Sequence, residues 1–340
     1  MAAKSTVAAG FVACLAVVSG NAVSDAATAG RFQIDSTTDA PDTSPGDGHC
    51  RAAGGKCTLR AAIMEANADP GSTIVVPAGR YALTIPPRLG PAFTDYTLSD
   101  AASGNLKIMA PITITGAGAG RTIVDGRHLD RVFTVLRPAT ISGLTVTGGR
   151  SAPTASPYNY YGGGGVLNAS SLTMRHVRVT GNTATFGGGI FNIPFSSFTL
   201  SDSLVDGNQA GEAGGIRFDW QGLVERSTIT GNRVVDPHDP TRPGELAGLG
   251  GGIDVRGPGI TVVGSKVTGN YADHGGGGIN ITLAYLPGPV APGFVGPGQV
   301  RLKDSVITGN TRQGGHSDCR AVHARFVSLG GNTDSDGSCR

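Results

Sequence analysis

The sequence has little charge, and neither sign of charge dominates. Charged residues make up 15% of the chain, and the formal net charge is +2. Net charge therefore predicts no electrostatic attraction to nucleic acid or to a membrane surface. The seven histidines show no metal-ligand spacing such as His-x-x-x-His. No apolar run after the N-terminal segment is long enough to cross a bilayer, so we expect no membrane span.

Glycine is what the sequence has in excess, with 55 residues. The glycines lack the Gly-X-Y period of collagen, and the steady supply of Val, Ile and Leu argues against a disordered chain. Glycine bounds many apolar runs of about three to five residues, which indicates many short strands. The 340 residues suffice for one large domain or two small ones.

The N-terminus of the chain resembles an export signal. A basic residue precedes an apolar stretch over 7–18, and Ala27 and Ala29 fit an A-x-A cleavage site, so the mature chain is expected to begin near Gly30. The apolar stretch is too short to span a bilayer. Cys14 raises the alternative of a lipoprotein, although it lies in the middle of the apolar stretch. We therefore expect a protein that is secreted and either extracellular or associated with the cell surface.

Four cysteines remain after the export signal: Cys50, Cys57, Cys319 and Cys339. An even count in an exported chain indicates two disulfides. Four cysteines allow three pairings, and proximity along the chain favours Cys50–Cys57 and Cys319–Cys339. A zinc site is the alternative, but the ligand spacing does not fit it and the compartment is oxidising.

One four-residue motif recurs from the middle of the chain to its end. It ends in Gly-Asn, as in Val179-Thr-Gly-Asn182 and Ile229-Thr-Gly-Asn232. Successive asparagines of the motif lie 26, 24, 38, 40 and 22 residues apart, at positions 182, 208, 232, 270, 310 and 332. A period in the low twenties with occasional insertions is typical of a solenoid, in which each coil is one repeat.

A second motif, Gly-Gly-Ile, follows most copies of the first, and its isoleucines are Ile190, Ile216, Ile253 and Ile279. Apolar residues also alternate before each Gly-Asn, as at Leu172 and Met174. Such alternation indicates strands with one buried face, and no helical pattern separates them. We therefore predict an all-β fold, a right-handed parallel β-helix, with strands of successive coils paired about 4.8 Å apart.

The asparagines of the first motif are predicted to be structural. In a stack of coils they would point inward and bond to one another along the stack through their side-chain amides. The neighbouring glycine permits the tight, left-handed turn that this position needs. The predicted ladder consists of Asn182, Asn208, Asn232, Asn270 and Asn310.

One helix is predicted over residues 59–68. Thr58 is placed to cap its N-terminus, Ile63 and Ala66 share one apolar face, and Asp69-Pro-Gly71 ends it. An open end of a β-helix would expose strand edges and apolar core. We therefore expect this helix, which comes just before the first coil, to cap the solenoid.

Parts of the chain resemble a known family. Residues 47–67, with Cys57-Thr-Leu-Arg-Ala-Ala-Ile-Met-Glu-Ala-Asn67, resemble the CSLREA-type N-terminal module of bacterial secreted proteins, although Ala61 stands where that motif usually has Glu. The Gly-Asn repeats resemble the pectin-lyase-like β-helices that follow the module, and residues 332–339 resemble the end of such proteins. The resemblance implies bacterial export and a secreted or surface role. It implies no catalytic residue, because pectin-lyase-like folds include lyases, hydrolases, epimerases and adhesins.

Charged residues follow the isoleucines of the second motif, on the face predicted to point outward. Aligning the coils places Arg217 beside Asp254, and Asp219 beside Arg256, on consecutive coils. In the simplest interpretation these crossed charges are surface salt bridges. In the functional interpretation they are a catalytic set. Its carboxylates would act as an acid–base or nucleophile pair, or bind Ca²⁺, while its arginines hold a uronate carboxylate.

Two insertions, 150–161 and 234–248, interrupt the same turn three coils apart. They could wall a groove over the coils that carry Glu212 and Asp219. Tyrosines of the first insertion could stack on sugar rings, or could simply pack the loop down. The predicted substrate-binding residues are therefore Glu212, Tyr158, Tyr160 and Tyr161.

The second insertion contains Asp236-Pro-His238-Asp239. This tetrapeptide is similar to the catalytic motif of alginate C5-epimerases, in which Asp and His handle the C5 proton. Removing a proton beside a carboxylate requires a base and a neutralised carboxylate. The match lies in a proline-rich loop, where Pro and Asp are common. Asp236, His238 and Asp239 join the candidate catalytic set on this resemblance alone.

The end of the chain offers a weak metal site. Asn332, Asp334 and Asp336, followed by Gly337, match the first half of a Ca²⁺-binding loop with oxygen ligands at alternate positions. No glutamate closes the loop. A disulfide-closed tail with turn-forming aspartates is the alternative, and Ca²⁺ is the only cofactor that the sequence suggests.

The sequence thus predicts a secreted or cell-surface β-helix, a monomer, that binds extracellular polysaccharide or another surface. Two alternatives stay open: a polysaccharide-active enzyme (a uronate lyase or C5-epimerase, less readily a glycoside hydrolase) and a non-catalytic structural protein. An enzyme should keep a cluster of charges free of salt bridges, and a binder should show an aromatic platform. The predicted segments are an export signal (1–29) and one domain (30–340), made of an N-terminal cap (30–71), coils (72–315) and a disulfide-closed C-terminal segment (316–340).

Overall fold

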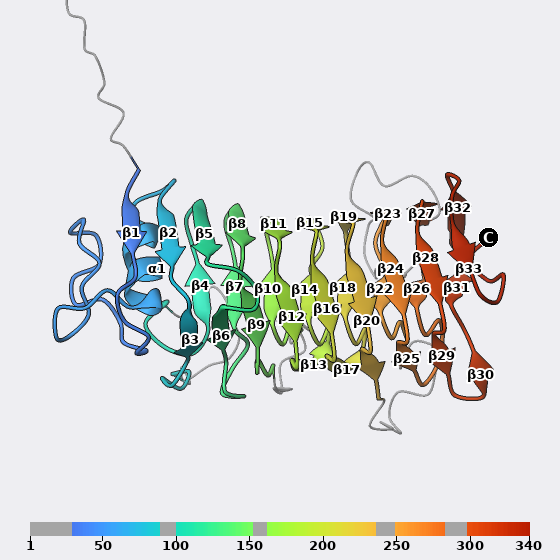
Figure 1. Cartoon of the computed structure of the whole chain (residues 1–340), viewed down its shortest axis with the longest axis horizontal. Helices are drawn as coiled ribbons and strands as arrows, with labels where there is room; N and C mark the ends of the chain where they lie inside the picture. The colour runs from blue at the N-terminus through green and yellow to red at the C-terminus, as the bar shows by residue number, and fades with distance from the viewer. Residues whose placement is uncertain (1–28, 89–99, 152–161, 236–248, 283–297) are drawn as a thin grey trace, which may run out of the picture.

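Short parallel strands wind into a right-handed β-helix in the computed structural model, and successive coils stand side by side along one long axis (Figure 1). The structure describes residues 29–88, 100–151, 162–235, 249–282 and 298–340. Strands at equivalent places in successive coils pair with one another in parallel, and only the last pair of the fourth sheet is antiparallel within the described residues. The predicted fold class is therefore confirmed.

Four sheets run along the stack, and a typical coil passes from the second sheet to the first, the third and the fourth. The first sheet contains β1 (Arg31–Gln33), β2 (Thr73–Val76), β5 (Ile112–Gly116), β8 (Ala139–Ser142), β11 (Ser171–Arg175), β15 (Ser197–Ser201), β19 (Gln221–Glu225), β23 (Gly259–Val263), β27 (Gln299–Lys303) and β32 (Arg325–Ser328). The second sheet contains β4 (Leu106–Ile108), β7 (Phe133–Val135), β10 (Val166–Asn168), β14 (Ile190–Asn192), β18 (Ile216–Phe218), β22 (Ile253–Val255), β26 (Ile279–Thr282) and β31 (Cys319–Val322).

The third and fourth sheets complete the coils. The third sheet contains β3 (Gly79–Ala82), β6 (Thr122–Asp125), β9 (Thr145–Thr147), β12 (Arg178–Thr180), β16 (Leu204–Asp206), β20 (Thr228–Thr230), β24 (Lys266–Thr268), β28 (Val306–Thr308) and β33 (Thr333–Asp334). The fourth contains β13 (Thr183–Phe186), β17 (Gln209–Glu212), β21 (Arg233–Val234), β25 (Tyr271–Ala272), β29 (Thr311–Arg312) and β30 (Gly315–His316).

The core fills the inside of the coils because successive side chains of a strand point to opposite faces. In β11, Leu172 and Met174 are buried, whereas Thr173 between them is half-buried. The isoleucines of the Gly-Gly-Ile motif point inward as predicted, and Ile190 and Ile216 have no exposed surface. One continuous apolar core therefore runs the length of the stack.

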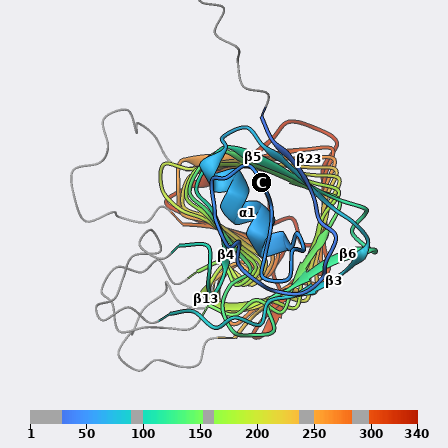
Figure 2. The same ribbon diagram turned by 90° about the vertical axis from the view of Figure 1, so that its left-hand side faces the viewer.

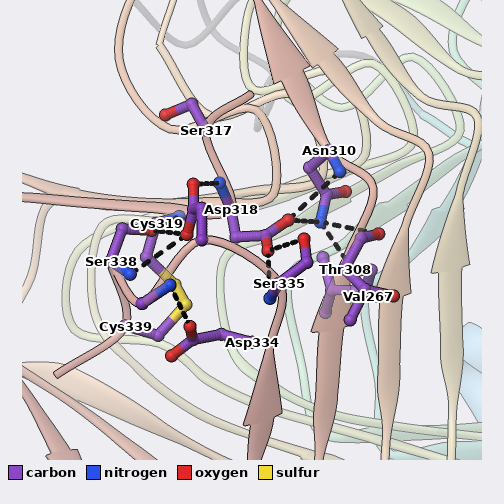
Figure 3. The surroundings of a disulfide bond; sticks show 12 residues. Val267, Thr308, Asn310, Ser317, Asp318, Cys319, Asp334, Ser335, Ser338 and Cys339 are labelled. Carbon is purple, nitrogen blue, oxygen red and sulfur yellow. Dashed lines mark hydrogen bonds between the residues drawn. A yellow bond between two sulfur atoms is a disulfide. The ribbon is translucent and has the colours of Figure 1, made fainter. Parts of the chain in front are cut away.

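The predicted asparagine ladder is present and fully buried. Each Nδ2 donates to the Oδ1 of the asparagine on the next coil, with N–O distances of 2.9 Å from Asn182 to Asn208, 2.9 Å from Asn208 to Asn232, 3.0 Å from Asn232 to Asn270 and 2.9 Å from Asn270 to Asn310. The ladder ends on a residue that the sequence pattern does not single out. Asn310 Nδ2 donates to Asp318 Oδ1 at 2.9 Å, and Ser335 bonds to the other carboxylate oxygen (Figure 3).

The predicted helix is α1 (Leu59–Ala68), which lies across the N-terminal end of the coils (Figure 2). The Thr58 side chain accepts a hydrogen bond from the Ala61 N–H, as expected for an N-cap. Ile63 and Ala66 are fully buried. Arg60, which the apolar pattern does not mark, is also fully buried, and its guanidinium pairs with Asp39 at 2.6 Å.

Both favoured disulfides are present, Cys50–Cys57 near the N-terminal end and Cys319–Cys339 near the C-terminal end. The predicted export signal lies outside the described residues, except for its last residue. Among the residues that the structure does describe, no helix has the length and apolarity needed to cross a membrane. The boundaries proposed for the N-terminal cap and the C-terminal segment stay predictions.

Candidate functional site

The residues that follow the inward positions of the second sheet form a continuous row along the stack, called here the outer row. Strand register places one of them on each coil: Leu167, Phe191, Arg217, Asp254, Asn280 and Arg320. The sequence predicts that this row lies on an exposed face, and this is wrong for most of its length. Leu167, Asp254 and Asn280 have no exposed surface. Side chains of the fourth sheet, such as Phe186 and Glu212, contact the row and cover it.

Five charged residues join on the outer row and beside it, and we call them the charge network: Glu212, Arg217, Asp219, Asp254 and Arg256. Arg217 Nε lies 2.7 Å from Asp219 Oδ1, and Arg256 Nε lies 2.8 Å from Asp254 Oδ2. Both guanidinium groups also reach the same atom, Glu212 Oε2, at 2.9 Å each. The pairing predicted across coils is therefore replaced by pairing within each coil, because residues two apart in a strand share a face. Glu212, at the end of β17, links the two coils.

The charge network is largely shielded from water. Asp254 is fully buried, and even the most exposed member, the side chain of Asp219, is 15% exposed. The Arg217 guanidinium also lies over the rings of Phe186 and Phe191, 4.6 and 5.0 Å from their centroids. Burial alone would lower the pKa of Arg217, but the carboxylates of Asp219 and Glu212 outweigh it and raise that pKa above its ordinary value.

The charge network includes four of the predicted catalytic residues and the predicted substrate-binding Glu212. Each of the two arginines is held by carboxylates, and each of the three carboxylates is held by an arginine. A substrate carboxylate or a Ca²⁺ ion would therefore have to displace an existing ion pair. The catalytic role of these residues stays a prediction, and the geometry favours a structural one.

A small cavity lies at the C-terminal end of the outer row. It has a volume of about 190 Å³, and its lining residues are Asp273, His274, Gly275, Arg312, Gln313 and Arg320. Arg312 ends β29 and Arg320 lies in β31, next to Asn280 by strand register. Within the described part of the chain, neither guanidinium has an ion-pair partner. This cluster is not visible in the sequence pattern, because the coil that carries Arg320 lacks the Gly-Gly-Ile motif by which the other coils align.

Two aromatic rings lie together on another edge of the second sheet, and we call them the aromatic platform: Phe195 and Trp220. They occupy equivalent turns of consecutive coils, between β14 and β15 and between β18 and β19. Their centroids are 4.7 Å apart with a tilt of 42°. Phe195 is 70% exposed, and its φ of 64° lies in a region that residues with side chains rarely adopt.

The predicted Ca²⁺ ligands bond to the protein itself. Asn332 Oδ1 accepts the Ser305 N–H at 3.0 Å, and Asp336 Oδ2 accepts the Asp318 N–H at 2.9 Å. Asp334 accepts the Gly337 N–H. These bonds hold the tail over the last coil, beside the Cys319–Cys339 disulfide (Figure 3). No group of three or more His, Cys, Asp or Glu that could hold a metal occurs in the described residues, and Ca²⁺ binding stays a prediction.

The remaining predicted site residues lie outside the described residues. They are the tyrosines of the first insertion and the epimerase-like tetrapeptide of the second: Tyr158, Tyr160, Tyr161, Asp236, His238 and Asp239. Their roles in stacking on sugars and in proton transfer stay predictions.

Comparison with known proteins places the chain near no assigned family. No protein-family model matches the sequence, and no curated protein matches it. Among solved structures, the crystal structure of pectate lyase Pel9A matches 92% of this chain and 82% of its own, with 15% identity and a TM-score of 0.39. The CSLREA-type resemblance of residues 47–67 therefore stays a prediction.

Proposed function

We propose that this protein binds extracellular polysaccharide at the aromatic platform. The ring pair, with Phe195 exposed and Trp220 half-buried, is the observation that carries the proposal. Phe195 keeps a left-handed backbone conformation while 70% of its surface stays in water, so its ring adds little to the core. A strained residue that adds little packing is typical of a functional position.

The surroundings of the platform fit a sugar better than a purely apolar partner. The first residues of β11, β15 and β19 lie beside it in register, and they are the exposed and uncharged Ser171, Ser197 and Gln221. The hydroxyls of Ser171 and Ser197 are 3.0 Å apart. A sugar ring has an apolar C–H face and a rim of hydroxyl groups. Aromatic rings can stack on the C–H face, and hydroxyl or amide side chains can form hydrogen bonds with the hydroxyl groups.

The two disulfides support an extracellular location, because disulfides form and persist in oxidising compartments. The charge network supports binding over catalysis, because its charged groups are already paired with one another. A platform without free charge recognises sugars by stacking.

Trp220 is the only tryptophan of the chain, so fluorescence excited where tyrosine does not absorb reports on the platform. We would titrate the mature protein with a panel of neutral and acidic polysaccharides. A saturable blue shift is expected as a sugar displaces water from the indole ring. Phe195→Ala should weaken binding roughly tenfold and leave the melting temperature nearly unchanged.

Leu329→Ala is the matched control, since Leu329 is another exposed apolar residue, on the last coil, and is 51% exposed. It should bind like the wild type. A flat fluorescence trace across the panel would contradict the proposal, and so would full binding by Phe195→Ala. Following the absorbance of unsaturated uronates in the same samples tests the enzyme alternative, because a rise would identify a lyase.

A further inference from the structure

The arginines of the cavity at the end of the outer row differ from those of the charge network in having no carboxylate partner. Arg217 and Arg256 share Glu212, and each has a second carboxylate of its own. Arg312 and Arg320 line a cavity of about 190 Å³ and make no ion pair with any described residue. Arg312 is exposed and Arg320 is half-buried, and both line the same hollow, where their guanidinium N–H groups are donors with no ion-pair partner.

The other charged residue of the cavity, Asp273, offsets one of the two positive charges and leaves the lining net positive. Asp273 lines the cavity, but its carboxylate bonds to the Tyr271 side chain, whose pKa is raised by burial and by this bond. The Arg233 guanidinium lies over the same tyrosine ring, 4.6 Å from its centroid. Asp273 therefore also contacts a tyrosine that an arginine stacks on, beside the cavity. His274 and Gln313 add side-chain donors to the lining.

A buried acceptor lies close to Gly275, one of the residues that line the cavity. Asn280 is fully buried, and its Oδ1 has no hydrogen-bond partner, while its Nδ2 donates to Asp254 at 2.7 Å. A Cβ added to Gly275, which lines the cavity, would come within 2.9 Å of this oxygen. Buried polar atoms are rarely left without a partner, so this acceptor marks an unusual place in the core beside the cavity.

We propose that Arg312 and Arg320 form a subsite for the carboxylate or sulfate group of an acidic polysaccharide. The subsite rests on the proposed function and narrows it from polysaccharide in general to acidic polysaccharide. The guanidinium groups of Arg312 and Arg320 bind the oxyanion. A volume of about 190 Å³ is large enough for one acid group.

The subsite and the aromatic platform are separate places on the molecule. Phe195 and Trp220 follow strands β14 and β18, whereas Arg320 lies in β31, three coils after β18 in the second sheet. At the usual spacing of strands, three coils span about 14 Å. A polysaccharide of several sugars is long enough to reach both places. Variants of one place should therefore leave the other place intact.

The test compares two polymers with one backbone, polygalacturonate and its fully methyl-esterified form, which has no charge. Calorimetric titration of the mature wild type should give at least about tenfold tighter binding of the acidic polymer. In the double variant Arg312→Gln, Arg320→Gln this preference should disappear, while the Trp220 fluorescence response to the neutral polymer stays. Dextran sulfate and dextran repeat the comparison for sulfate. A preference for only one of the two acidic polymers distinguishes a carboxylate site from a sulfate site.

Arg226→Gln is the charge-matched control. Arg226 is an exposed arginine that follows β19 of the first sheet and pairs with Asp202. It should keep the full preference. Equal binding of the acidic and neutral polymers by the wild type would overturn the subsite while leaving the platform proposal standing. A preference that survives the double variant would also overturn it, as would an equal loss in Arg226→Gln.

A second measurement separates failure of the subsite from failure of the proposed function. If no polymer binds, the proposed function is wrong, and the subsite is tested with glucuronate and inorganic sulfate on nitrogen-15-labelled protein. Saturable shifts of the Arg312 and Arg320 Nε–H resonances, absent for Arg226, would show that the oxyanion site exists without a polymer function. No shift of these resonances would overturn the subsite.

Discussion

The charge network and the cavity each contain an arginine of the outer row, but the two arginines have different partners. Arg217 and Arg320 occupy equivalent register positions three coils apart. The Arg217 side chain is 12% exposed and is held by two carboxylates. Arg320 is half-buried and faces a cavity. An arginine on this row is therefore a structural residue in one coil and a candidate ligand in another.

The position four residues after each ladder asparagine accounts for much of the difference. Glu212 follows the ladder residue Asn208 by four, and His274 follows Asn270 by four. Glu212 supplies the carboxylate that both arginines of the network share. His274 supplies none, and the cavity opens beside it. The lesson is that a charged residue in a repeat gains its role from the partner that the neighbouring sheet provides.

The largest expected effect comes from removing that shared carboxylate. Glu212→Gln leaves both Arg217 and Arg256 with a neutral amide in place of a charge, in a region largely shielded from water. Breaking a buried ion pair by removing one partner costs about 3–5 kcal/mol, so the free energy of unfolding should fall by that amount. Denaturant unfolding measures it. A loss under about 1 kcal/mol would show that solvent reaches the network and that its pairs behave like surface pairs.

A second substitution converts the cavity into a copy of the network. His274→Glu places a carboxylate at the position equivalent to Glu212, within the lining that Arg312 and Arg320 share. The new carboxylate should pair with these arginines and abolish the preference for acidic over neutral polymer, although both arginines remain. A tenfold loss of preference corresponds to about 1.4 kcal/mol of binding free energy.

The control for this substitution is His274→Gln, which changes the same side chain without adding charge. It should retain the preference for acidic polymer in the same calorimetric titration. If His274→Glu and His274→Gln bind alike, the free arginines do not set the preference, and the comparison between cavity and network fails.

Regular features of this molecule follow from the sequence because each depends on short spacings along the chain. Alternation at Leu172 and Met174 predicts strands with one buried face, and repetition of Gly-Asn predicts the ladder that Asn182 begins. Helix α1 follows from its cap and its apolar face, and both disulfides follow from proximity.

The candidate site depends instead on the turns between sheets, which have no repeating pattern. Alignment correctly places Arg217 beside Asp254, yet it does not show that Glu212 reaches over from the fourth sheet to bury both. Trp220 stands out as the only tryptophan, but its contact with Phe195 depends on a turn with a positive φ. Sequence spacing alone predicts which residues are neighbours along a sheet. It does not predict how the turns and the neighbouring sheet pack against that sheet.

The smallest expected effect comes from a third environment for arginine, the exposed pair between Arg226 and Asp202. The hydrogen bond from Arg226 lowers the pKa of Asp202 below its ordinary value. A carboxyl whose pKa is lowered by folding stabilises the fold above its unfolded pKa, and this contribution disappears as the pH falls through the folded value. Arg226→Gln should therefore lower the melting temperature only slightly near neutral pH, and not at all well below pH of about 4. A decrease as large as that of Glu212→Gln would show that burial does not separate the charge network from ordinary surface pairs.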